Sequence, residues 1–144
     1  RLDFGARWLS EGIFDKLPPE RGEPFRTLVP TVDADGNEVA GVRLPDVAVP
    51  RATYAGWNVR GSNCGGEGLL SRYIGSYFPF HRMPEERRAD SDPRPAVTER
   101  YPSRQAYLDR VSAAARQLQQ ERFLLEEDVT AIQKAAAARQ LWAQ

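Results

Sequence analysis

The chain is poor in the features that define several common classes of protein. Its single cysteine, Cys64, excludes an internal disulfide framework. No apolar run approaches the roughly 20 residues that a helix needs to span a bilayer. Twenty basic residues balance twenty acidic ones, and this neutral charge gives no electrostatic case for nucleic acid or an anionic membrane as a partner. No Walker-type or dinucleotide-binding glycine loop is present, and we expect no cofactor.

Turn-forming residues are abundant instead. The 144 residues include 11 glycines and 11 prolines, most of them before residue 96, which is a heavy load for an independent domain of this size. The chain begins at Arg1 without a methionine or a signal-peptide pattern, and the letters RLDFGARW resemble the interior of a sequence. We therefore expect residues 1–144 to be a single region of a longer chain.

Residues 1–45 are predicted to form a helix or turn followed by a β-hairpin. Two extended runs flank Asp35-Gly36-Asn37, and an acidic residue followed by glycine between such runs is a strong hairpin signal. Pro30 has no backbone N–H to donate, so the first run is expected at the edge of a sheet. Upstream lies an apolar group that needs a surface to cover it, formed by Phe4, Trp8, Leu9, Ile13, Phe14 and Leu17.

Residues 46–102 are predicted to be mostly glycine- and proline-rich aromatic loop, with a short helix at PEERRAD (84–90), where proline suits the first turn. Residues 103–144 are the most regular part of the chain. Ser103 is a natural N-cap, and two helices with a short break at RFLL (122–125) should pack as an antiparallel α-hairpin. The fold class expected is therefore irregular α+β. The stripe expected to face inward recurs at helical spacing and comprises Tyr107, Val111, Ala114, Ala115, Leu118, Val129, Ile132, Ala136 and Leu141.

The stretch TVDADGNEVAG (31–41) places Asp33, Asp35 and Asn37 where a calcium-binding loop has its first three oxygen ligands. Such a loop also needs glycine at its sixth position and a bidentate glutamate at its twelfth. Counting from Asp33, those positions hold Glu38 and Leu44. Turn chemistry accounts for all of these residues, so we expect a turn and no metal.

No catalytic residue can be assigned from the sequence. A nucleophilic Cys64 needs a base that is held within hydrogen-bonding distance and is itself oriented by a third group. His81 is the only histidine, and nothing in the sequence fixes it against Cys64. The Gly-Ser pairs in RGSNCGG and IGSYFPF do not match the nucleophile elbow of serine hydrolases. Cys64 is therefore expected to be dispensable.

The loops also gather aromatic side chains. TYAGWNVRG (53–61) and GSYFPF (75–80) hold five rings, beside Asn58 and Arg60. Loops of this composition often line binding pockets, but the rings are also candidates for the core of a domain with little regular structure. Under the first interpretation the substrate-binding candidates are Tyr54, Trp57, Asn58 and Tyr77; under the second these rings, with Phe78 and Phe80, are structural.

Several of these segments together resemble one known family. LVPTVDADGNEVAGVRLPDVAVPRATYAGWNVRG (28–61), GSYFPF, DPRPAVTERYPSRQAYLDRV (92–111) and LLEEDV (124–129) are similar to the C-terminal portion of a bacterial family of α/β-hydrolase domain-containing proteins. The resemblance covers nearly the whole chain, and VDADGNEVAG and TYAGWN are its most specific parts. It implies that the nucleophile serine and the catalytic histidine lie upstream. Members usually lack a histidine after PF, so His81 is a poor candidate for the catalytic one.

The resemblance implies a C-terminal region that packs against a hydrolase core and helps to wall its active site. The expected partner is that upstream core, in the same chain or in a companion chain, and an ester or related acyl compound is the generic substrate. Fold alone does not set the substrate. Two alternatives from other classes remain open: a stand-alone module that binds a small ligand or a peptide, and a structural or subunit-interface element.

Overall fold

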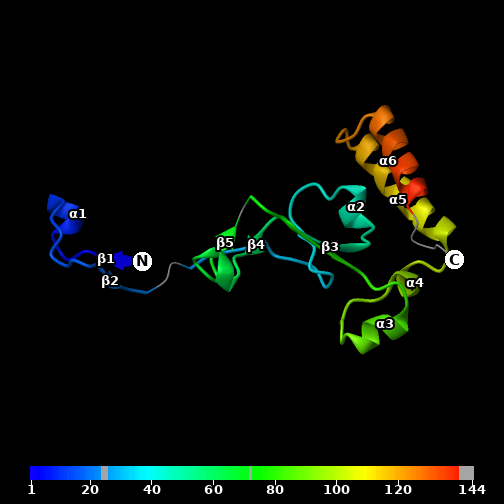
Figure 1. Cartoon of the computed structure of the whole chain (residues 1–144). Helices are drawn as coiled ribbons and strands as arrows, with labels where there is room; N and C mark the ends of the chain where they lie inside the picture. Colours follow the sequence, from blue (N-terminus) through cyan, green and yellow to red (C-terminus); the bar gives the residue numbers. More distant parts are fainter. Residues whose placement is uncertain (24–25, 72, 140–144) are drawn as a thin grey trace.

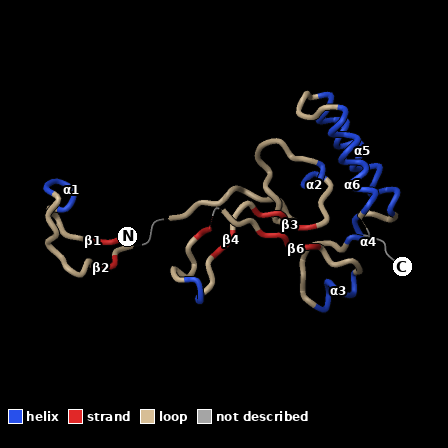
Figure 2. The backbone as a smooth tube through the Cα atoms, turned by 45° about the horizontal axis from the view of Figure 1, so that its top comes forward, coloured by secondary structure: helices blue, strands red, loops and turns tan. Residues whose placement is uncertain are grey.

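The computed structural model describes residues 1–23, 26–71 and 73–139. It confirms an irregular α+β fold in which small antiparallel strand pairs precede a C-terminal antiparallel pair of helices. Figures 1 and 2 place β1, α1 and β2 at one end of the molecule and the long helices α5 and α6 at the other, with the remaining strands between them.

The N-terminal end is a small lobe held by side chains. β1 (Leu2–Asp3) pairs antiparallel with β2 (Glu20–Arg21). Between them lies α1 (Trp8–Glu11), which ends at a left-handed Gly12 with φ of 71°. The rings of Phe4, Trp8 and Phe14 contact one another with centroid distances of 4.6 to 5.2 Å. The apolar group predicted here is thus only partly covered.

The segment after the lobe contains the predicted turn but little of the predicted strand pairing. Val32 and Glu38 form a single antiparallel bridge around the turn. Two backbone hydrogen bonds accompany it, from Asp33 N–H to the Asn37 oxygen (2.8 Å) and from Val39 N–H to the Thr31 oxygen (3.1 Å). The loop thus forms the tip of a hairpin as predicted, but within the described residues the extended runs do not pair beyond this tip. Pro30 has no N–H to donate on one side, and on the other Gly41 (φ 78°) redirects the chain towards α2 (Pro45–Ala48).

The predicted loop region 46–102 contains an irregular hairpin. β3 (Ala52–Ala55) pairs antiparallel with β6 (Ser76–Pro79), and β4 (Asn58–Val59) pairs with β5 (Leu70–Ser71) inside it. Only Gly56 and Trp57 separate β3 from β4, whereas residues 72–75 separate β5 from β6. The tip holds a short 3₁₀ helix (Ser62–Cys64). Dense glycine obscured these short strands at the sequence level.

Two short helices follow the hairpin. α3 (Pro84–Ala89) coincides with the helix predicted at PEERRAD, and Glu86 caps it by accepting the backbone N–H groups of Arg82 (2.9 Å) and Met83 (3.1 Å). α4 (Val97–Arg100) precedes the long helices. Its N-terminus is held in the same way, because Glu99 accepts the N–H of Ala96 at 2.7 Å. Both helices therefore begin where a glutamate satisfies otherwise free N–H groups.

α5 (Arg104–Gln120) and α6 (Glu126–Ala138) form the predicted antiparallel pair. Ser103 caps α5, its Oγ accepting the N–H of Ala106 at 3.1 Å. The predicted stripe faces inward: its buried members are Tyr107, Val111, Ala115, Leu118, Val129 and Ala136, while Ala114 and Ile132 are partly buried. Leu141 and Trp142 lie outside the described residues. Within the described ranges, no helix is both long and apolar enough to cross a membrane.

The hydrophobic core lies where these helices meet the hairpin. It combines Val49 after α2, Phe80 at the end of β6, Val97 and Tyr101 around α4, and the buried face of α5 and α6. The Tyr101 hydroxyl donates to the carbonyl oxygen of Pro50 at 2.8 Å, and its ring meets that of Tyr107 edge-on at 5.2 Å. The core therefore joins residues from 49 to 136 into one packed unit.

Truncation of the buried stripe should destabilise the chain measurably. Leu118, only 8% exposed, should lower the free energy of unfolding by about 2–5 kcal/mol when changed to alanine, because a cavity replaces packed methyl groups. Urea denaturation followed by circular dichroism measures the change. Leu9→Ala is the matched control, since Leu9 is 90% exposed and should change stability by less than about 0.5 kcal/mol. Equal costs for both variants would contradict the packing described.

Candidate functional site

The turn at residues 33–37, here called the acidic turn, is the most connected polar feature of the molecule. The Asp33 carboxylate folds back over the turn, and its Oδ1 accepts the N–H groups of Asp35 (2.9 Å) and Asn37 (3.0 Å). Its Oδ2 forms a 2.5 Å ion pair with Arg43. Partial burial by itself raises the pKa of Asp33, but these N–H groups and the arginine outweigh it, so the pKa is lowered overall.

Asn37 attaches the turn to the hairpin. It is completely buried and is the only buried polar residue among those described. Its Nδ2 donates to the carbonyl oxygen of Ala52 at 3.0 Å, and its Oδ1 accepts the N–H of Tyr54 at 2.8 Å. A side-chain amide carries one donor and one acceptor in the same arrangement as a peptide group. Asn37 therefore acts as a neighbouring strand would along β3.

A second attachment runs from the turn to α4. The Arg100 guanidinium makes a bidentate ion pair with Asp35, with 2.7 Å from Nη1 to Oδ2, and its carbon lies 4.1 Å from the centroid of the Phe80 ring. The side chains of this pair are only 14% and 16% exposed. Thr53 Oγ1 donates to the Asp35 carbonyl oxygen. A Cβ on Gly36 would lie 2.8 Å from the Thr53 methyl group, so this contact requires glycine.

These contacts explain why the spacing of oxygens in the acidic turn resembles a calcium loop. The carboxylates of Asp33 and Asp35 are each paired with an arginine, and both polar atoms of the Asn37 amide bind backbone groups. A guanidinium charge thus occupies the place that a cation would need. Across the described ranges, no group of three or more histidine, cysteine or acidic side chains is arranged to hold a metal ion.

An arginine also joins the hairpin to the loop after α3. Arg94 Nη1 donates to Thr53 Oγ1 (2.8 Å) and to the Phe78 carbonyl oxygen (3.0 Å), and Nη2 pairs with Asp92 at 2.6 Å. The hydrogen bonds from Arg94 lower the pKa of Asp92 to about 2. His81 Nε2 lies 3.2 Å from an Asp90 oxygen and 3.8 Å from an Asp92 oxygen. His81 thus faces carboxylates and no serine hydroxyl among the described residues.

The four candidate binding residues lie on the irregular hairpin. Tyr54 and Tyr77 are directly opposite each other in β3 and β6, with ring centroids 5.4 Å apart. Trp57 and Asn58 follow a few residues later, where the Trp57 carbonyl oxygen accepts the Ser76 hydroxyl at 3.3 Å. Tyr77 is 52% exposed, Tyr54 and Trp57 are half-buried, and Asn58 is exposed. The structure brings the two tyrosines together and leaves Asn58 at the surface.

Tyr54 stands out chemically. Its hydroxyl is buried and has no hydrogen-bond partner in the part of the chain that the structure describes, and the same burial raises its pKa. Of the five rings considered as core, Phe80 is the one that the structure buries, whereas Phe78 is 53% exposed. A buried hydroxyl without a partner is unusual in proteins and marks a place where a ligand or water can bind.

Within the described residues, no contact joins Cys64 to a base. It ends the 3₁₀ helix at the hairpin tip and is exposed. Its Sγ contacts the neighbouring Asn63 Oδ1 at 3.3 Å. His81, the histidine considered as its base, lies beside Asp90 and Asp92 instead.

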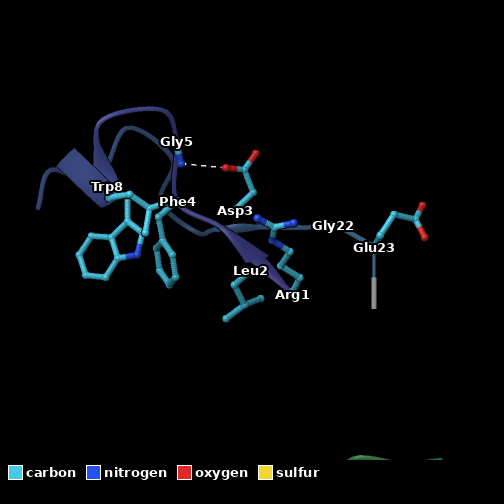
Figure 3. Close-up of a pocket in the computed structure, with 9 residues that line it drawn as sticks. Arg1, Leu2, Asp3, Phe4, Gly5, Trp8, Gly22 and Glu23 are labelled. Carbon is cyan, nitrogen blue, oxygen red and sulfur yellow. Dashed lines mark hydrogen bonds between the residues drawn. The ribbon is translucent and has the colours of Figure 1, made fainter. Parts of the chain in front are cut away.

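A hollow of about 800 Å³ lies in the N-terminal lobe. Figure 3 shows the Phe4 and Trp8 rings on one side of it, Leu2 and Arg1 on another, and the hydrogen bond of 3.0 Å from the Gly5 N–H to Asp3. The Asp3 carboxylate is also paired with Lys16 at 2.5 Å. The hollow is open and mostly apolar, and offers no nucleophile, so its walls are suited to packing more than to chemistry.

Sequence reasoning did not select the arginines that organise this region. Arg94 and Arg100 are separated from their partners Thr53 and Asp35 by 41 and 65 residues. Their signal was limited to the family-like segment DPRPAVTER (92–100), which contains Asp92 and both arginines. The acidic turn, in contrast, was singled out from the sequence, and the structure shows it at the centre of the polar network. Its role there is structural, because arginines and backbone groups occupy its side chains.

The chain belongs to the alpha/beta hydrolase domain family, whose model matches residues 5–134. The match covers the acidic turn, the irregular hairpin and most of the α5–α6 pair, which agrees with the resemblance seen in the sequence. No curated protein and no solved structure matches the chain.

Removal of the buried Asn37 side-chain amide should lower the stability of the fold. Asn37→Ala leaves the Ala52 carbonyl and the Tyr54 N–H without partners, and each unsatisfied buried group costs about 1–3 kcal/mol. We expect the free energy of unfolding to fall by about 2–4 kcal/mol in urea denaturation. Asn58→Ala is the control, because Asn58 is exposed and its substitution should stay within about 0.5 kcal/mol of the unmodified chain. A small cost at Asn37 would count against its bridging role.

The Asp92–Arg94 pair should make stability depend on acid. The pKa of Asp92 is about 2 in the folded state against an ordinary value of 3.8, so its contribution is complete above about pH 4 and is lost as the pH falls towards 2. Asp92→Asn should therefore destabilise the chain at pH 7, and the difference should shrink between pH 4 and pH 2. Denaturation curves at pH 7, 4 and 2 measure this. Asp109→Asn, on the exposed face of α5, serves as the control. A difference that is constant with pH would exclude the proposed pairing.

Proposed function

We propose that this chain is the C-terminal region of a hydrolase of the alpha/beta hydrolase domain family, where it packs against the catalytic core and lines part of the active-site pocket. The core supplies the nucleophile, the base and the oxyanion donors, and ester-like acyl compounds are the substrate class. The chain itself supplies surface and binding contacts, and no catalytic residue.

The amount of exposed surface is the observation that supports this proposal most directly. The chain exposes 10591 Å². A compact monomer of 16.2 kDa exposes about 7,500 Å². The excess of about 3,000 Å² is well above the roughly 800 Å² that a standard protein interface buries on each partner. A chain with this much uncovered surface is suited to packing against a larger body.

The composition of that surface agrees with its area. Leu9 is 90% exposed, Leu28 86% and Tyr73 100%. The rings of Phe4, Trp8 and Phe14 contact one another and form an apolar cluster, and Figure 3 shows two of them, Phe4 and Trp8, beside the hollow. Single exposed apolar residues are ordinary, but large contiguous apolar patches mark interaction surfaces. An adjoining hydrolase core is the partner that family membership favours.

The absence of an assembled triad in the described residues supports a non-catalytic role. Acyl transfer needs a nucleophile, a base that touches it and oxyanion donors in one place. His81 contacts Asp90 and Asp92, and the exposed Cys64 contacts Asn63. The pocket-lining part of the role is assigned to Tyr54, Trp57, Asn58 and Tyr77, because the Tyr54 hydroxyl is buried without a partner and the other three present side chains nearby on the same hairpin.

Activity measurements test this division of labour. We expect the 144-residue chain to be inactive on a panel of p-nitrophenyl esters, and the complete protein encoded by its reading frame to be active. Trp57→Ala in the complete protein should mainly raise KM or change the preferred acyl length, since it removes contact area and leaves the nucleophile in place.

Phe123→Ala is the matched control, because Phe123 is an exposed ring in the turn between α5 and α6, away from the hairpin, and should leave KM unchanged. Turnover by the 144-residue chain alone would overturn the proposal. A complete protein that hydrolyses no ester would instead favour a binding module.

A further inference from the structure

A smaller hollow of about 300 Å³ lies between the acidic turn, the chain after α2, and the start of the long helices. It is separate from the N-terminal hollow of Figure 3. Its polar wall carries three guanidinium groups, from Arg43, Arg100 and Arg110, and two carboxylates, from Asp33 and Asp35. Ala48, Val49 and Pro50 form an apolar wall. The hollow thus combines a concentrated set of hydrogen-bond donors with a small hydrophobic surface.

The charges in this hollow do not cancel. Arg43 pairs with Asp33 at 2.5 Å, and Arg100 makes its bidentate pair with Asp35. Among the described residues Arg110 has no carboxylate partner, and its guanidinium carbon lies 5.5 Å from the centre of the Tyr101 ring. Three positive groups against two negative ones leave a formal excess of one positive charge. That excess is located on α5, at the edge of the hollow.

Arg43, which lines this hollow, has one buried donor without a partner among the described residues. The Arg43 Nε is shielded from solvent and makes no hydrogen bond, although Nη2 of the same guanidinium binds Asp33 and the Val47 carbonyl oxygen. Leaving a charged donor unsatisfied costs more than leaving a neutral one. Arg43 and Arg100 are thus committed to the acidic turn, whereas the exposed Arg110 carries donors that no carboxylate among the described residues occupies. A ligand that accepts hydrogen bonds can use the Arg110 donors without displacing an ion pair.

We propose that this hollow binds a small monoanionic carboxylate with a compact apolar body. A planar carboxylate matches the fork of a guanidinium group. A phosphate dianion suits the site less well, because Asp33 and Asp35 lie in the same wall and the excess positive charge is single. The hydrocarbon part of the ligand contacts Ala48, Val49 and Pro50. This site is independent of the pocket-lining role proposed above, because none of Tyr54, Trp57, Asn58 and Tyr77 lines this hollow.

Binding of benzoate to the 144-residue chain tests this site, with benzamide as the neutral analogue of the same shape. We expect saturable chemical-shift changes in ¹H–¹⁵N spectra at constant ionic strength, located at residues 47–50 and at the Nε–H groups of Arg43 and Arg110. Benzamide should produce none of these changes. Arg110→Gln should weaken benzoate binding roughly tenfold, because it removes the one guanidinium without a carboxylate partner and leaves the ion pairs of the turn intact.

Arg116→Gln is the control, since Arg116 lies on the exposed face of the same helix and should leave the Kd within about twofold. Arg110→Lys keeps the charge but loses the planar fork, so it provides a second variant if Arg110→Gln perturbs the fold, and it should also weaken binding. The proposal fails if benzoate shows no saturable binding, if benzamide binds equally, if inorganic phosphate binds more tightly, or if neither change at Arg110 alters the affinity.

Discussion

The buried amide of Asn37 is the contact on which the middle of this molecule depends. The surrounding chain has little regular pairing: the strands are short, and the segment before the hairpin shares only the Val32–Glu38 bridge. Asn37 compensates by offering its side chain to Ala52 and Tyr54 as a strand neighbour would. Backbone groups that lie in the interior must be paired, and in a chain this irregular a side chain has to do it.

The arginines extend this principle over longer distances. Arg100 fixes the acidic turn to α4, and Arg94 fixes the hairpin to the loop after α3, each by a fork of hydrogen bonds directed at oxygen atoms. Both guanidinium groups also lie against the face of Phe80, at 5.2 Å for Arg94 and 4.1 Å for Arg100. One core ring thus carries two cations on its surface, which joins the polar network to the hydrophobic core through a single residue.

The accuracy of the sequence-based expectations follows the range of the interactions involved. The α5–α6 pair, the Ser103 cap and the helix at Pro84–Ala89 were predictable, because helix periodicity and capping depend on neighbours within a turn or two. The turn at Asp35-Gly36-Asn37 was predictable for the same reason. The arginines that pair with its carboxylates were not predictable. Arg100 is 65 residues away from Asp35, and no local pattern distinguishes it from the other arginines of the chain. Nor could local patterns reveal strands of two to four residues divided by glycines.

The two connections between the outer and inner strand pairs of the hairpin differ in length, and this difference has a consequence. Two residues connect β3 of the outer pair to β4 of the inner pair, whereas four residues connect β5 of the inner pair to β6 of the outer pair. The outer pair is held from outside as well, by Asn37 on β3 and by Arg94 on the Phe78 carbonyl oxygen of β6. These contacts do not involve the tip, so a change in the length of the tip leaves them in place. Doubling the length of a loop costs only about 0.6 kcal/mol in closure entropy. The tip is therefore a place where the length of the chain can change while β3 and β6 stay paired.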